Sequence, residues 1–504
     1  MKRLSLVMRR CACAAFLCAL FAGCGPGYRD DLYRAERRLW KIRKTQSAVF
    51  ALPKQSQNAG MKETAQAYAA FVAGLPDPGA LDPTSDPLLS QLLQIRATAQ
   101  MEEARWLAAS GNEEGALEAL RQASRDYAWN PRVTAEAFLD RLALLEKRVD
   151  ADAYAEAVEE LVRTVDLAAF RDELPPRLVS SLRTSARLYA VQQRVDRAAI
   201  QRKGAVQILT GLLEKGPAPV AEVLIETELA LLAIEGGDPK ASLGHYEKAI
   251  DASRGTEWQA ALEFSVANLY LGALDRPSEA VDRFRRFAED HPESPLAARA
   301  LLLAGTALRT LSRHEEALLV LSRADSLAQR NPDLHAAIIL ESALVENGRG
   351  QWPRALSLLR RAVADAPRTP AGLSAPLYIA SHHLAQGEEA AARAVIDRTL
   401  RDYDGIAETE TDPEVLLTVL EMRSKARILL EDWEEAVEAL LEIARFAPGS
   451  DIGPPAILEA ARLSTEKLER PELTRRIWNQ VIAVYPNTPL ADLAARELGA
   501  HPEP

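Results

Sequence analysis

The side chains of this 504-residue sequence that could do chemistry are its seven histidines, several pairs of neighbouring glutamates and four cysteines. His382 and His383 are adjacent, so on a helix their rings point about 100° apart and cannot share one metal ion as an i, i+4 pair could. Neighbouring glutamates diverge in the same way and cannot act together on one substrate atom. The sequence also lacks the HExxH, GxxxxGK(S/T) and GxSxG motifs. We therefore predict that the chain is not an enzyme and has no catalytic residue, cofactor, metal site or small-molecule substrate.

The cysteines indicate processing at the N-terminus instead. All four lie within the first 24 residues, which excludes a disulfide scaffold in the rest of the chain. Basic residues precede an apolar run that ends at Ala22, the pattern of a cleavable signal peptide. The stretch from Leu20 to Cys24 (LFAGC) resembles a bacterial lipobox, which implies cleavage before Cys24 and attachment of lipid to its thiol. The alternative is an ordinary secretory signal that ends near a cysteine.

The composition predicts a folded, helical chain. Apolar residues make up 48% of it and charged residues 26%, so a core can be buried, while aromatic residues are only 6%. The 61 basic and 72 acidic residues give a net charge of −11, and there is no long basic run. Nucleic acid is therefore not an expected partner.

An internal repeat dominates the sequence after residue 200. Its pattern is a small residue, here named the anchor, then a large apolar residue at four, an apolar or small residue at seven and often proline at twelve. Anchors stand at 205, 242, 280, 317, 355, 392, 436 and 474, a spacing of 37 or 38 residues with one of 44. Looser copies begin at Ala116 and Ala157. The positions predicted to pack the repeats are Ala205, Ala280, Phe284, Pro292, Ala355, Leu359, Pro367, Ala436, Leu440, Pro448, Trp478 and Pro486.

The residues around each anchor predict helical hairpins. Glycine stands five residues before the anchor at 111, 237, 350 and 387, where its left-handed conformation can end a first helix. Neighbouring glutamates then begin the second helix, whose dipole favours negative charge at that end. Junctions such as Pro292-Glu-Ser-Pro295 stop one helix, cap the next and place proline in its first turn. Trp352 and Trp433, three residues before anchors, are expected in the core.

Two stretches, Phe284–Arg299 and Val484–Ala495, show a resemblance to a known family. With the repeat, they are similar to tetratricopeptide repeats in the variant of BamD-type outer-membrane assembly lipoproteins and YbgF (CpoB) periplasmic proteins. The resemblance implies an all-α fold, an α-solenoid of stacked helical hairpins in a right-handed superhelix.

The chain is predicted to have five parts: a signal peptide (1–23), an anchor region with a basic helix and linker (24–87), irregular helical repeats (88–200), the tetratricopeptide-like array (201–499) and a tail (500–504). Arg29–Lys44 has apolar residues at helical spacing, with seven basic and three acidic residues. This helix either rests on anionic head groups or docks on the solenoid with a solvated basic face. Loop is expected at 53–62, an irregular linker at 74–86 and a break at 404–413.

The function is predicted from the shape of the stacked hairpins and from the predicted cellular location of the protein. Stacked hairpins present a long curved surface that binds peptides or protein faces, so protein partners are expected in a groove formed by the first helices. Gly25 follows Cys24, and in the sorting pattern that this resembles such a residue permits transfer to the outer membrane, facing the periplasm. We expect a lipid-anchored scaffold in outer-membrane protein assembly or envelope maintenance. The alternatives are a regulator of a peptidoglycan synthase or hydrolase and an enzyme resembling lytic transglycosylases.

Overall fold

The computed structural model describes residues 27–83, 85–170, 174–192, 194–328, 331–450, 452–485 and 488–500. The predicted signal peptide, its lipidation site Cys24 and the predicted packing residue Pro486 lie outside these ranges. Within them, all regular structure is helical, with 23 α-helices, three short 3₁₀ helices and no strand.

The chain divides into two compact units, residues 1–228 and 229–504. The first unit contains α2 (Gly27–Gln46), η1 (Val49–Ala51), α3 (Lys54–Ala73), η2 (Pro78–Ala80), α4 (Pro87–Ala109), α5 (Glu113–Asp126), α6 (Pro131–Lys147), α7 (Ala151–Thr164), η3 (Leu167–Phe170), α8 (Pro176–Val191) and α9 (Val195–Leu213). The division falls within α10 (Pro219–Glu235). The second unit contains α11 (Pro239–Ala252), α12 (Trp258–Leu271), α13 (Pro277–Asp290), α14 (Ala297–Thr310), α15 (His314–Ala328), α16 (Pro332–Gly348), α17 (Trp352–Asp365), α18 (Pro370–Ala385), α19 (Glu389–Thr409), α20 (Pro413–Leu429), α21 (Trp433–Phe446), α22 (Gly453–Glu466), α23 (Pro471–Val484) and α24 (Pro489–Ala500).

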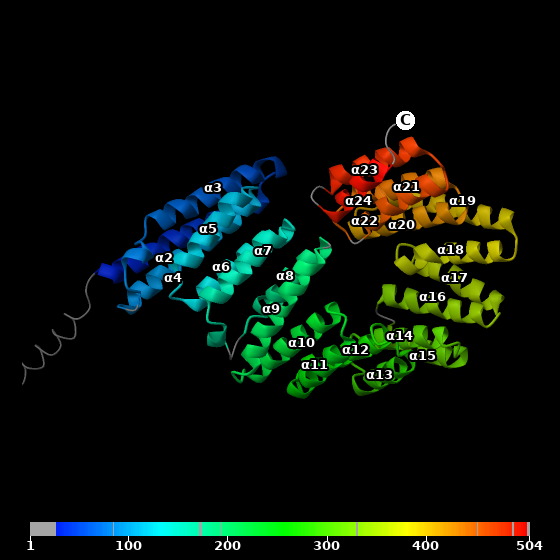
Figure 1. The fold of residues 1–504 in the computed structure, drawn as a ribbon, viewed down its shortest axis with the longest axis horizontal. Coiled ribbons are helices and arrows are strands. Elements are labelled where there is room, and N and C mark those ends of the chain that lie inside the picture. The colour runs from blue at the N-terminus through cyan, green and yellow to red at the C-terminus, as the bar shows by residue number, and fades with distance from the viewer. Residues whose placement is uncertain are drawn as a thin grey trace, which may run out of the picture. The chain divides into compact units, whose positions relative to one another are not determined.

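Within each unit, neighbouring helices pack as hairpins that stack on one another (Figure 1). The first helices of successive hairpins also touch. In the first unit α4 touches α6 and α6 touches α8, and in the second α14, α16, α18 and α20 form a similar row. This arrangement confirms the predicted all-α fold, an α-solenoid of tetratricopeptide-like hairpins.

The hairpin turns have a common backbone feature. A residue with positive φ stands two positions before the second helix, and at 111, 237, 350 and 387 it is glycine, as predicted. Five further turns place Val149, Asp275, Ser312, Glu431 or Glu469 there, with φ between 49° and 59°. Sequence reasoning did not identify these turns because it looked only for glycine, although other residues adopt this conformation at a cost of roughly 1–2 kcal/mol.

The structure corrects the register of two early repeats. For the anchor at 116 and for every anchor from 242 onward, the second helix begins three residues before the anchor. For example, α5 begins at Glu113, three residues before Ala116. α7 begins at Ala151 and α9 at Val195, so the equivalent positions are Tyr154 and Ala198 rather than Ala157 and Ala205. Ala157 and Ala205 are nevertheless buried, because shifts of three or seven residues return to nearly the same helix face. Successive second helices start 37, 38 or 44 residues apart throughout the series.

Two segments predicted as irregular are helical, so those predictions were wrong. Most of 53–62 belongs to α3. The sequence of this helix is mostly polar, but one face has about one buried residue per turn, including Thr64 and Tyr68. Most of the predicted break at 404–413 belongs to α19, which has 21 residues where α17 and α21 have 14. The added turns account for the 44-residue interval, and near their start the Tyr403 hydroxyl donates a hydrogen bond to the Leu373 carbonyl. The expected linker at 74–86 is irregular apart from η2 in the part that the structure describes.

The predicted packing residues that the structure describes differ in their burial. Seven of them are buried, each at most 5% exposed: Ala205, Ala280, Phe284, Ala355, Leu359, Ala436 and Leu440. Trp478 is only partly buried. Pro292, Pro367 and Pro448 are exposed just beyond the ends of α13, α17 and α21, so the prediction that they pack repeats together was wrong. Proline has no N–H to continue a helix, and here it marks the end of one without joining the core.

Candidate partner-binding groove

Helix α2 docks on α3 and α4 by its apolar side. Ala35 and Leu39 are buried, at 2% and 6% exposure, in a cluster that also contains Tyr68, Phe71 and Leu92. Leu32 and Ile42 pack against the same cluster. The structure therefore shows that this helix docks on the solenoid by its apolar side, which leaves its basic side exposed.

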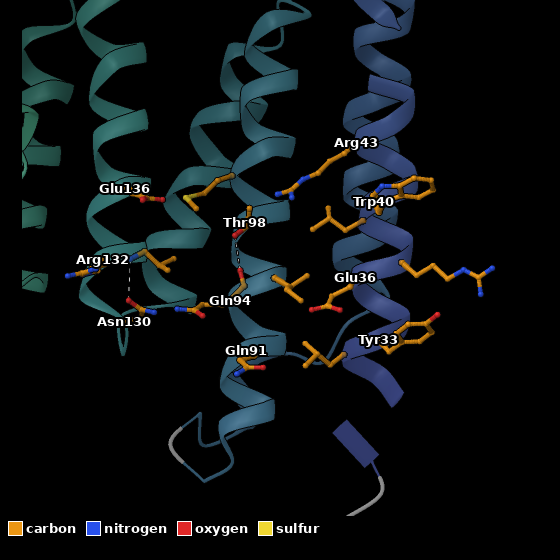
Figure 2. A pocket seen from close by; sticks show the side chains of 16 residues that line it. Tyr33, Glu36, Trp40, Arg43, Gln91, Gln94, Thr98, Asn130, Arg132 and Glu136 are labelled. Atoms are coloured by element: carbon orange, nitrogen blue, oxygen red, sulfur yellow. Dashed lines mark hydrogen bonds between the residues drawn. The ribbon is translucent and has the colours of Figure 1, made fainter. Parts of the chain in front are cut away.

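Helices α2, α4 and α6 line a groove of about 1010 Å³ (Figure 2). Its apolar lining comes from all three helices: Leu32, Leu39, Ile95, Met101 and Val133. The polar residues among its lining are Glu36, Arg37, Arg43, Gln91, Gln94, Thr98, Asn130, Arg132 and Glu136, and two aromatic residues, Tyr33 and Trp40, complete it. The groove thus combines an apolar surface with hydrogen-bonding and charged groups.

Local sequence signals position the helices of this groove. Asp86 caps α4 by accepting a hydrogen bond from the Leu88 amide at 2.7 Å, and Pro87 occupies the first helical turn. Asn130 caps α6 in the same way through the Val133 amide, at 3.4 Å. Both caps define where their helices begin. Gln91 and Gln94 lie in the first turns of α4, on the side that lines the groove.

The side chains of α4 that face the groove are available for hydrogen bonds. Gln91 and Gln94 are exposed, and their carboxamides form no hydrogen bond with the described residues. The Thr98 hydroxyl donates a hydrogen bond to the backbone carbonyl oxygen of Gln94 at 3.0 Å. The hydroxyl oxygen of Thr98 is still free to accept a hydrogen bond. Figure 2 shows Gln91, Gln94 and Thr98 along one side of α4, with Glu36 and Arg43 of α2 across from them. A row of unpaired amides is suited to bonding the backbone of an extended segment.

A buried polar network supports the groove from behind. The Tyr127 hydroxyl, at the end of α5, accepts a hydrogen bond from Arg96 of α4 at 3.0 Å and donates to Gln100 at 3.3 Å. Arg96 also pairs with Asp126, at 3.6 Å. Burial raises the pKa of the Tyr127 phenol to about 12. Between the two groove helices themselves, Arg105 of α4 pairs with Asp140 of α6 at 2.9 Å. These contacts fix α4 relative to its neighbours.

The remaining candidates for chemistry do not converge. The His382 ring stacks on Trp352 with centroids 3.4 Å apart, while the His383 ring pairs with Glu388 at 2.6 Å. Trp352 and Trp433 are partly buried against the hydrophobic clusters of their own hairpins. In the described ranges, no three His, Cys, Asp or Glu side chains are grouped so that they could hold a metal ion.

Sequence reasoning placed the binding surface on the first helices but did not identify its residues. Tyr33 and Trp40, seven residues apart and 64% and 60% exposed, were one usable signal, because large aromatic side chains are seldom so exposed. The polar residues at 91, 94 and 98, spaced three and four apart, were another. Neither belongs to the repeat pattern, which describes mainly the second helices.

No protein-family model and no curated protein matches the sequence. Many solved structures resemble it, among them a tetratricopeptide repeat protein from Parabacteroides merdae (18% identity, TM-score 0.34, 57% of this chain and 99% of that one). Another is Pseudomonas aeruginosa PilF (19% identity, TM-score 0.29, 48% of this chain and 99% of that one). A third is YrrB, described as a TPR protein with an unusual peptide-binding site (18% identity, TM-score 0.28, 45% of this chain and 98% of that one). These scores are too low to bear on function. Among the described residues, no helix is both long and apolar enough to cross a bilayer.

Proposed function

We propose that this chain is a lipid-anchored scaffold of the bacterial cell envelope that holds partner proteins by a linear segment bound in the α2–α4–α6 groove. The observation that carries the proposal is the groove itself, in which three helices surround an apolar surface with charged groups and with the unpaired amides of Gln91 and Gln94. Such a surface can hold apolar side chains of a segment while the Gln91 and Gln94 amides bond its backbone.

The proposed location in the cell envelope rests on the sequence. The lipobox-like stretch ending at Cys24 supports a lipid anchor, and Gly25 supports transfer to the outer membrane. An anchored scaffold works by tethering, because confinement to a membrane surface raises the local concentration of whatever it binds. The resemblance of the repeat junctions to those of BamD-type and YbgF-type proteins supports a role in outer-membrane protein assembly or envelope maintenance.

Site-specific photocrosslinking in intact envelopes tests the groove. A photoreactive amino acid replaces Gln94 in one chain and Gln122 in a second chain. Gln122 is a matched control because it is an exposed glutamine on α5, and no residue of α5 lines the groove. We expect the same partner to be crosslinked from position 94 and not from position 122.

Two results would contradict the groove assignment: equal crosslinking at both positions, or no adduct at 94 from an expressed and folded chain. Combining each probe with Cys24→Ala separates the anchor from the groove. Loss of the chain from the membrane with the same adduct at 94 supports both parts of the proposal. If the adduct is a peptidoglycan synthase that the purified chain stimulates, the alternative function as its regulator replaces the assembly role.

A further inference from the structure

The face of α2 that points away from its docking side combines aromatic and cationic side chains. Tyr33, Arg37, Trp40 and Lys44 follow one another at intervals of four, three and four residues, so they lie on one side of the helix. All four are exposed, and Lys41 beside them is exposed as well. Tyr33, Arg37 and Trp40 also line the groove, whereas Lys41 and Lys44 do not. We call these five residues the α2 stripe. The Lys44 ammonium lies over the Trp40 ring, 5.4 Å from its centroid.

The cations of the α2 stripe are not neutralised by the protein. Arg37, Lys41 and Lys44 form no ion pair within the described residues, whereas many arginines elsewhere do, such as Arg105 with Asp140 and Arg183 with Glu228. The helix has seven basic and three acidic residues in a chain whose net charge is −11. An unpaired positive patch on an acidic protein is complementary to an anionic surface.

We infer that the α2 stripe binds the surface of an anionic lipid bilayer. Lysine and arginine beside an anionic leaflet are attracted to its lipid phosphates, and tyrosine and tryptophan rings are favoured at the level of the head groups. The opposite face of the helix cannot insert, because Ala35 and Leu39 are buried against α3 and α4. The membrane contact therefore differs from that of a free amphipathic helix and uses the polar and aromatic side.

The biological use of this contact depends on the proposed function. α2 begins at Gly27, three residues after the predicted lipidation site Cys24, so a lipid on Cys24 brings the stripe to the bilayer. The lipid and the stripe then act together and orient the first unit on the membrane. The vesicle binding itself needs no lipid on the protein, and it can be measured separately from partner capture.

Sedimentation with vesicles tests the inference. The chain from residue 24 onward with Cys24→Ala is mixed with vesicles of phosphatidylglycerol and phosphatidylcholine, or of phosphatidylcholine alone. The test variant is Lys41→Gln/Lys44→Gln, because neither lysine lines the groove. The control is Lys62→Gln/Lys203→Gln, which removes two exposed lysines from α3 and α9 that also form no ion pair.

We expect binding to the anionic vesicles only, weakened by salt, because the attraction is electrostatic. The Lys41/Lys44 variant should lose roughly 20-fold in vesicle affinity, since each lysine near the surface is worth about fivefold. The control variant should bind within about twofold of the parent. Replacing Trp40 by Ser should weaken binding further and reduce its residual part at high salt.

Equal binding to neutral vesicles, no binding to anionic ones, or an equal loss in both lysine variants would overturn the inference. So would a Lys41/Lys44 variant that binds vesicles normally but loses a partner protein in the photocrosslinking experiment, because the stripe would then be a protein-binding surface. If vesicle binding fails while the adduct at position 94 persists, the scaffold proposal stands alone. The reverse result leaves the membrane contact without the groove.

Discussion

Gly372 lies against the carbonyl oxygen of Ala366, so close that a Cβ on residue 372 would overlap that oxygen. The two residues belong to the junction where α17 ends and α18 begins, and the Thr369 hydroxyl accepts a hydrogen bond from the Gly372 amide there, at 3.1 Å. Gly453 has the same relation to the carbonyl oxygen of Ala447, at the junction of α21 and α22. These two junctions are therefore closed by a backbone contact that only glycine permits.

Gly372→Ala should destabilise the protein by about 1–3 kcal/mol, because the backbone of the junction must move to admit a methyl group. Gly405→Ala is the matched control. Gly405 is inside α19 with open space around its Cβ direction, so alanine there should be neutral or stabilising by up to about 1 kcal/mol. Urea unfolding followed by circular dichroism measures both changes. Equal stability of the two variants would show that the junction adapts freely.

A second prediction concerns the ion pair between α6 and α7. The Arg141 guanidinium donates to Glu160 at 2.6 Å, and its side chain is only 6% exposed. Glu160→Ala should cost about 3 kcal/mol of unfolding free energy, because it leaves a buried charge without a partner. The exposed pair Arg254–Asp251 serves as the control, and Asp251→Ala should change the free energy by less than about 1 kcal/mol. A cost for Asp251→Ala as large as that for Glu160→Ala would contradict this explanation.

Tyr127 predicts how stability depends on alkaline pH. Burial raises the pKa of its phenol from 10.0 to about 12, so the folded state disfavours the phenolate. This contribution to stability is complete below pH 10 and declines as the pH rises toward 12, because the unfolded chain loses the proton first. Tyr127→Phe should make the decline in unfolding free energy between pH 10 and 12 less steep without removing it, because burial also raises the pKa of Tyr154, Tyr189 and Tyr403. Tyr33→Phe, at an exposed tyrosine, should leave it as steep as in the parent chain.

The groove makes a prediction about affinity. Gln91→Ala/Gln94→Ala removes two exposed amides of α4, so the unfolding free energy should change by no more than about 0.5 kcal/mol for each site. Affinity for the partner segment mapped by crosslinking should fall roughly tenfold, because each lost hydrogen bond is worth about 0.5–1.5 kcal/mol. Isothermal titration calorimetry measures the change. A normal affinity would show that the segment does not use these amides.

The repeat pattern predicted the second helices well because each of them must present a small residue and a large apolar residue to its neighbours. Ala280 and Phe284 are examples, and both are fully buried. The register failed at Ala205, where an alanine two turns from the equivalent Ala198 satisfies the same pattern. A periodicity of 3.6 residues identifies a face of a helix more reliably than it identifies the position along it.

The sequence by itself determined the array of hairpins from residue 242 onward and the turns that contain Gly111, Gly237, Gly350 and Gly387, because helix stops, caps and buried small residues are local requirements that each repeat must satisfy. It also determined that Arg29–Lys44 has an apolar side and a basic side. Only the tertiary structure decided that the apolar side is covered by α3 and α4, which leaves Tyr33 and Trp40 exposed. The groove was decided in the same way: its residues come from three helices far apart in the chain, and their meeting depends on how hairpins stack rather than on any local pattern.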